Sequence, residues 1–101
     1  MAVTPTALYR GAATTTLTTT LYTVPASTTA VVTEIMAANT AATAATFTIY
    51  LNGTIIANTI TVGANDTTII QCRQPLSATQ TIQGGASATT VNLSISGVQI
   101  V

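Results

Sequence analysis

The side chains that could carry out chemistry are few in this sequence. They are two carboxylates, Glu34 and Asp66, two arginines, Arg10 and Arg73, and one cysteine, Cys72, and there is no histidine or lysine. General acid–base catalysis uses groups that titrate near neutral pH, and a serine or threonine nucleophile needs such a group as its base. The two carboxylates fall in separate predicted elements, a strand and a turn. We therefore expect a protein that is not an enzyme and has no catalytic residues.

Metal and cofactor sites are not expected either. One cysteine and two acidic residues cannot complete the ligand shell of zinc or calcium, and Gly84-Gly85 lies outside any phosphate-loop pattern. Asp66 is predicted to be a turn residue that binds its own backbone, and Glu34 to face solvent or a subunit partner. Cys72, with only Arg73 as a neighbouring cation, is predicted to be a small buried hydrophobe.

The charge balance limits the partners. The formal net charge is zero and no block of like charge occurs, so we expect neither nucleic acid nor an anionic membrane surface as a partner. Residues 1–6 have neither the basic region nor the apolar run of a signal peptide, and no apolar stretch has the roughly 18 residues of a membrane span. We expect synthesis in the cytoplasm. So little charge also suits a protein that functions in an assembly.

The dominant periodicity is two, which predicts strands. Residues 46–51 alternate threonine or tyrosine with large apolar side chains and then meet Asn52-Gly53, the strongest short hairpin signal. An irregularity is expected near Asn58 on the returning strand. Residues 41–45 are expected to connect two strands, and residues 63–66 are expected to form a turn. Residues 75–77 and Gly84-Gly85 are expected to lie between strands as breaks. Strands are predicted over residues 6–10, 17–24, 29–39, 46–51, 54–62, 67–72, 79–83 and 91–100.

Seven or eight strands at this spacing predict an all-β fold, an antiparallel β-sandwich of immunoglobulin-like or jelly-roll type. Within residues 29–39, Val31, Ile35 and Ala37 are predicted to share the inward face. A bulge at Gly97 is predicted to shift the inward face of the last strand. We expect residues 1–15 to form an extended N-terminal arm and residues 16–101 a single β-sandwich domain.

The segment Leu17-Thr-Thr-Thr-Leu-Tyr-Thr-Val-Pro-Ala26, followed by Thr29-Ala-Val-Val32, resembles a motif of small virion proteins of tailed bacteriophages. The likeness extends over most of the chain from Leu17 onward. It implies a capsid decoration (cement) protein, made in the host cytoplasm and placed on the capsid surface of the virion. Its partners would be the major capsid protein and further copies of itself in a homotrimer. Only the motif at residues 21–25 can be carried over by position.

The resemblance and the irregular N-terminal pattern together suggest four contact residues. Leu8, Tyr9, Arg10 and Tyr22 are candidates for contact with the capsid or a neighbouring subunit, because tyrosine is common at interfaces and the first three lie in the predicted arm. Two alternatives remain open: a tail, baseplate or head-fibre subunit, and a β-sandwich module that binds a carbohydrate or host surface. The second is weakened by the scarcity of aromatic and acidic residues.

Overall fold

A computed structural model describes residues 2–101, and its regular elements are all strands. Residues 2–101 contain no helix that is long and apolar enough to cross a membrane. The eight strands are β1 (Val3–Ala12), β2 (Thr20–Thr23), β3 (Thr29–Asn39), β4 (Ala45–Leu51), β5 (Thr54–Val62), β6 (Thr67–Leu76), β7 (Thr81–Ala86) and β8 (Val91–Ile100). The prediction of an all-β fold is confirmed.

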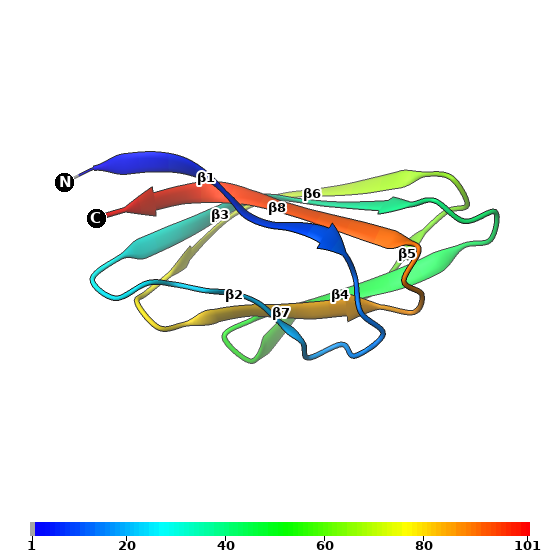
Figure 1. Cartoon of the computed structure of the whole chain (residues 1–101), viewed down its shortest axis with the longest axis horizontal. Helices are drawn as coiled ribbons and strands as arrows, with labels where there is room; N and C mark the ends of the chain where they lie inside the picture. The colour runs from blue at the N-terminus through cyan, green and yellow to red at the C-terminus, as the bar shows by residue number, and fades with distance from the viewer. Residues whose placement is uncertain (1) are drawn as a thin grey trace.

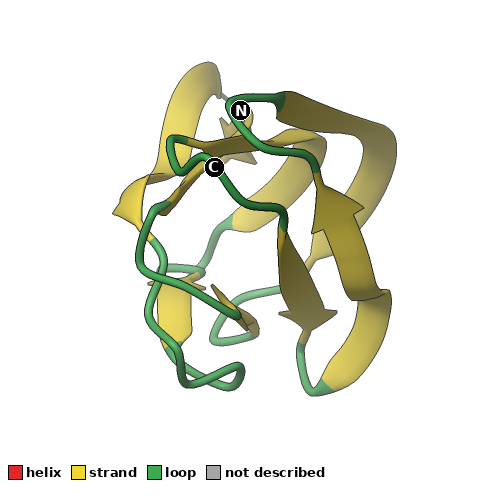
Figure 2. Cartoon of the chain, turned by 90° about the vertical axis from the view of Figure 1, so that its right-hand side faces the viewer, coloured by secondary structure: helices red, strands yellow, loops and turns green. Residues whose placement is uncertain are grey.

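The strands form two antiparallel four-stranded sheets that pack as a sandwich (Figures 1 and 2). Sheet A has the order β1-β8-β3-β6 and sheet B the order β2-β7-β4-β5. The chain passes from one sheet to the other at every connection except the β4–β5 hairpin. This strand order is that of the jelly roll, the eight-stranded double Greek key found in viral capsid and lectin domains, so the second of the two predicted sandwich types is the one observed.

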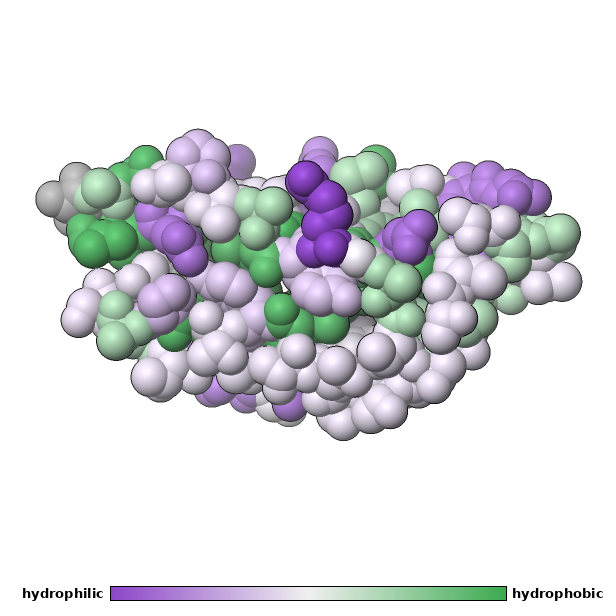
Figure 3. Space-filling view, viewed as in Figure 1, coloured by the Kyte–Doolittle hydropathy of each residue, from purple (hydrophilic) through white to green (hydrophobic). Residues whose placement is uncertain are grey.

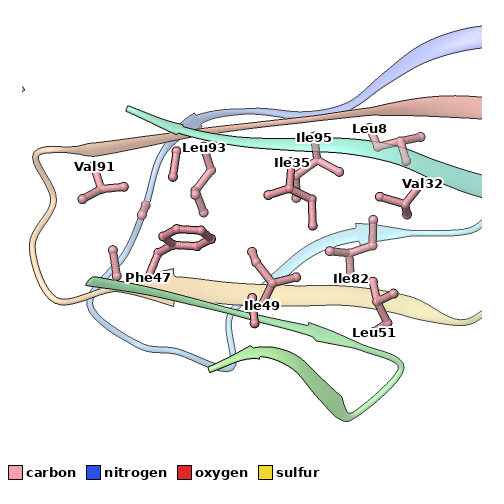
Figure 4. Close-up of a cluster of buried hydrophobic side chains, with 14 of the residues drawn as sticks. Leu8, Val32, Ile35, Phe47, Ile49, Leu51, Ile82, Val91, Leu93 and Ile95 are labelled. Atoms are coloured by element: carbon pink, nitrogen blue, oxygen red, sulfur yellow. The ribbon is translucent and has the colours of Figure 1, made fainter. Parts of the chain in front are cut away.

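The core between the sheets is aliphatic, with Phe47 as its only aromatic ring among the fully buried side chains of residues 2–101. Figure 4 shows Phe47 and Ile49 of β4 directed toward Ile35 and Leu93 of the opposite sheet. In β4 the predicted inward face is confirmed, because Phe47, Ile49 and Leu51 are buried. Thr48, predicted on the other face, is buried as well, and its hydroxyl accepts a hydrogen bond from Thr59 N at 3.1 Å. Burial of apolar area at about 25 cal/mol per Å² is the main stabilising contribution here.

The predicted turns are confirmed in detail. Asn52 and Gly53 both have positive φ angles, 49° and 83°, as a type I′ hairpin turn requires. Asp66 Oδ1 accepts a hydrogen bond from its neighbour Thr67 N at 2.8 Å, the backbone role expected of it. The irregularity near Asn58 is a register shift in the β4–β5 pairing, with Thr59 at a φ of 53°.

β-Bulges in sheet A overturn two predictions about which residues face inward. Thr33 is an extra residue between Val32, which pairs with Gly97, and Glu34, which pairs with Ser96. The bulge changes the phase of β3, so Val32 is buried and Val31 faces outward, contrary to the prediction. β8 itself continues through Gly97 without a phase change. The predicted bulge at Gly97 is wrong, because the extra residues lie in the strands on either side of β8.

The chain start and two predicted breaks also differ from expectation. Instead of a separate arm, residues 3–12 form strand β1, which pairs with β8 along its length. Pro75 lies inside β6, where an edge strand tolerates the missing N–H donor. Gly84 and Gly85 lie inside β7, and the second is covered closely by the loop after β1: a Cβ on Gly85 would stand 2.4 Å from the Thr16 carbonyl oxygen.

Candidate functional site

The structure distributes the four candidate contact residues between the core and the surface. Leu8 is buried, with 6% of its surface exposed, and is the bulged residue of β1, so it packs in the core. Tyr9 is half-buried and its hydroxyl donates to the Ala12 carbonyl oxygen at 3.0 Å. Tyr22 is also half-buried, and its hydroxyl accepts a hydrogen bond from Gln99 Nε2. Arg10 alone is exposed, with its Nε 3.4 Å from Ser94 Oγ.

The outer face of sheet A is organised in rows, because residues paired across antiparallel strands project to the same side, and three of these rows cover its middle. We call this surface the sheet A face. An apolar row is formed by Pro5, Val98, Val31 and Pro75. A polar row follows, formed by Ala7, Ser96, Glu34 and Gln71. The third row combines two polar and two apolar side chains, Arg10, Ser94, Met36 and Ile69.

A shallow groove of about 640 Å³ lies at the polar row. Its position follows from irregular pairing: β3 has Thr33 as an extra residue relative to β8, and β6 has both Cys72 and Arg73 between the partners of Val32 and Glu34. These extra residues separate the neighbouring backbones and turn polar side chains to one surface. The groove is lined by Thr33, Glu34, Gln71, Cys72, Arg73 and Ser96.

The groove collects unlike charges and hydrogen-bonding groups but has no catalytic arrangement. Thr33 Oγ1 donates to the Ser96 carbonyl oxygen at 3.1 Å, and Cys72 Sγ lies 3.5 Å from the Val32 carbonyl oxygen. Burial raises the pKa of the Cys72 thiol, which disfavours the nucleophilic thiolate. Within residues 2–101 no group of three or more metal-ligating side chains occurs. The groove is therefore suited to binding through charge and hydrogen bonds.

Apolar side chains are exposed on both sheets as well as at the chain end. Ile69 of β6 is 53% exposed, and Ile55 and Ile56 of β5 are 41% and 43% exposed. Leu17, in the loop that leads to β2, is 38% exposed. Figure 3 shows a surface that is mostly weakly polar or weakly apolar, with one strongly hydrophilic group near the middle of the upper layer. Several sides of the molecule therefore present contact surface of low charge.

Comparison with known proteins adds no family to these observations. No protein-family model matches the chain, and no curated protein matches it.

Sequence reasoning missed the groove, although it singled out three of the residues around it. The sequence relates Cys72 only to its neighbour Arg73, and nothing in the spacing along the chain relates residue 34 to residue 73. The pairing of β3 with β6 brings them together. The one available signal was the interrupted alternation at Val31-Val32-Thr33-Glu34, where two polar residues follow two apolar ones and a bulge restores the pattern.

Proposed function

We propose that this chain is a non-enzymatic structural protein of a virion, a decoration (cement) protein that binds the assembled head of a tailed bacteriophage and stabilises it. Its partners in this proposal are the major capsid protein and further copies of itself in a homotrimer on the capsid surface. Nucleic acid, membrane and cofactors have no part in it.

The observation that carries the proposal is an almost uncharged jelly roll with large apolar side chains exposed on both sheets. Single exposed apolar residues are ordinary on monomeric proteins. Here they occur on β5, β6 and the loop before β2, while only four charged side chains serve the whole surface. A subunit held between several neighbours needs such surfaces, and jelly rolls are common in viral capsids. The resemblance of residues 17–32 to small phage virion proteins supports the same proposal.

The direct test is to localise the protein in purified particles of the virus that encodes it, after separating heads from tails. We expect the protein on heads, accessible to surface labelling. Heads stripped of it should release their DNA at a lower temperature, and adding the purified protein back should restore the original temperature. Its presence on tails alone, or its absence from particles, would refute the proposal.

Salt provides a second test of the mode of attachment. Contacts made mainly by apolar burial are little affected by screening, even at about 1 M salt, where the Debye length falls to about 3 Å. We therefore expect the protein to stay on the heads at that concentration. Release at moderate salt would show that charge pairs hold it there and would contradict the proposed mode of binding.

A carbohydrate-binding module is the second candidate, and the sheet A groove is the observation that favours it. Jelly rolls include lectin domains, and the Glu34, Gln71 and Arg73 side chains are polar groups of the kind that bind sugar hydroxyls. The groove lining contains no aromatic ring on which a sugar could stack. Binding to a glycan array that is lost in Glu34→Gln would favour this candidate, and a featureless array would remove it.

A further inference from the structure

The sheet A face has the charge pattern of a surface that recognises a copy of itself. Three of the four charged residues of the chain, Arg10, Glu34 and Arg73, lie on this face, and both signs are represented. Glu34 belongs to β3, an inner strand, and Arg73 to β6, an edge strand, and both line the same groove. The remaining charged residue, Asp66, is engaged in a turn.

The strand edges of sheet A are poorly suited to association, which leaves the face as the available surface. β1 carries Pro5 and the bulge at Leu8, and β6 carries Pro75 and the irregular pairing at Cys72 and Arg73. Prolines and bulges at edge strands prevent another strand from adding to the sheet. A partner that binds sheet A therefore packs against its side chains instead of extending its hydrogen-bonded ladder.

The charged side chains of the groove, Glu34 and Arg73, are available to pair with a partner. Among the side chains that line it, only those of Thr33 and Cys72 donate hydrogen bonds within residues 2–101. The Arg73 side chain is exposed, and that of Glu34 is half-buried on the groove wall. A carboxylate and a guanidinium offered side by side form a self-complementary pair, because a facing copy presents the same two groups in reversed order.

We propose that the sheet A face binds the sheet A face of a second copy of this chain, with Glu34 of one copy paired with Arg73 of the other. The apolar row of Pro5, Val98, Val31 and Pro75 packs beside this pair and supplies buried area. The charge pair fixes the register of the contact and excludes unlike partners. This contact forms between copies of the purified protein in solution and does not depend on the proposed function in a virion.

The test is sedimentation equilibrium of the purified full chain over a wide concentration range, with charge-reversed variants. Wild type is expected to self-associate. Glu34→Arg and Arg73→Glu each place like charges opposite one another, and each should weaken association at least about tenfold. The double variant Glu34→Arg/Arg73→Glu restores opposite charges across the contact and should recover most of the wild-type association.

The matched control is Glu34→Arg/Arg10→Glu, which has the same net charge as the restored double variant and alters the same face. It should remain as weakly associated as Glu34→Arg, because Arg10 lies in another row. Far-UV circular dichroism checks that each variant is folded, and all three positions are exposed or half-buried. A monomeric wild type, unaffected single variants, or equal recovery in the two double variants would each overturn the proposal.

Discussion

Gly97 in the middle of β8 is the position where adding a single methyl group should disturb the fold most clearly. A Cβ on Gly97 would lie 2.1 Å from the Val31 carbonyl oxygen and 3.0 Å from its carbonyl carbon. Contacts below about 3 Å to backbone atoms cannot be relieved by rotating a side chain. β8 is held between β1 and β3, so relief requires displacing a central strand of sheet A.

Two opposing effects set the magnitude for Gly97→Ala. Reduced freedom of the unfolded chain favours alanine by about 0.4–1 kcal/mol. Overpacking of a well-packed interior costs about 1–3 kcal/mol or more, and the backbone contact here belongs at the upper end of that range. We expect a net loss of at least about 2 kcal/mol in the free energy of unfolding. For a domain of this size, that loss lowers the melting temperature by about 8–16 °C.

The assay is urea denaturation followed by far-UV circular dichroism at one fixed protein concentration, since self-association would make stability depend on concentration. Gly63→Ala is the matched control, because its Cβ would meet nothing closer than the Asp66 carboxylate oxygen at 3.4 Å. That variant should be as stable as wild type or slightly more stable. If Gly97→Ala unfolds within about 0.5 kcal/mol of wild type, the reasoning about β8 is wrong.

Further predictions concern the loop after β1, a buried amide, the thiol and the proposed contact between two sheet A faces. In Gly85→Ala the new Cβ would press on two carbonyl oxygens of that loop, at 2.4 and 2.7 Å, and hydrogen exchange should show faster exchange of the β7 amides that bond to it. Asn39→Ala should cost about 2–4 kcal/mol, measured by denaturation, because the buried amide donates to the Thr43 carbonyl at 2.8 Å and its oxygen accepts two further hydrogen bonds. Burial raises the pKa of Cys72, so the thiol should react with iodoacetamide more slowly than a free cysteine at pH 8, and equal reaction rates would contradict this. The contribution of the neutral thiol to the free energy of unfolding should be lost as pH rises through the raised pKa. Two sheet A faces packed against each other make both Glu34–Arg73 pairs across one two-fold contact, so mixing Glu34→Arg with Arg73→Glu brings opposite charges together at both pairs and should restore association; no recovery on mixing would contradict this contact.

Local patterns predicted the elements whose conformation depends on neighbours in the sequence. Residues 29–39, 54–62 and 91–100 were predicted with the bounds observed, because β-branched alternation and flanking turn residues specify a strand locally. The Asn52-Gly53 turn followed from the positive φ that both residues tolerate. Predictions failed where a residue's role depends on which strand lies beside it, as for Pro75 at an edge and Gly85 under a loop.

The candidate contact residues illustrate the same limit. The irregular pattern of the first residues predicts Leu8 at a contact surface, yet a bulge in the β1–β8 pairing turns its side chain into the core. Tyr22 and Gln99 are 77 residues apart in the sequence and meet by a hydrogen bond only because the β2 and β8 layers stack. The groove between Thr33 and Arg73 arises in the same way from pairing between distant strands.

Composition and alternation by themselves determined that this chain is a β-sandwich with only four charged side chains and neither histidine nor lysine, since these are properties of residue types and of short-range spacing. Only the tertiary structure decided that the sandwich is a jelly roll, that Val31 faces outward, and that Glu34 and Arg73 share one groove. The physical reason is that strand order and bulges are set by pairing between residues far apart in the chain. A single extra residue in one strand changes which face every following side chain presents.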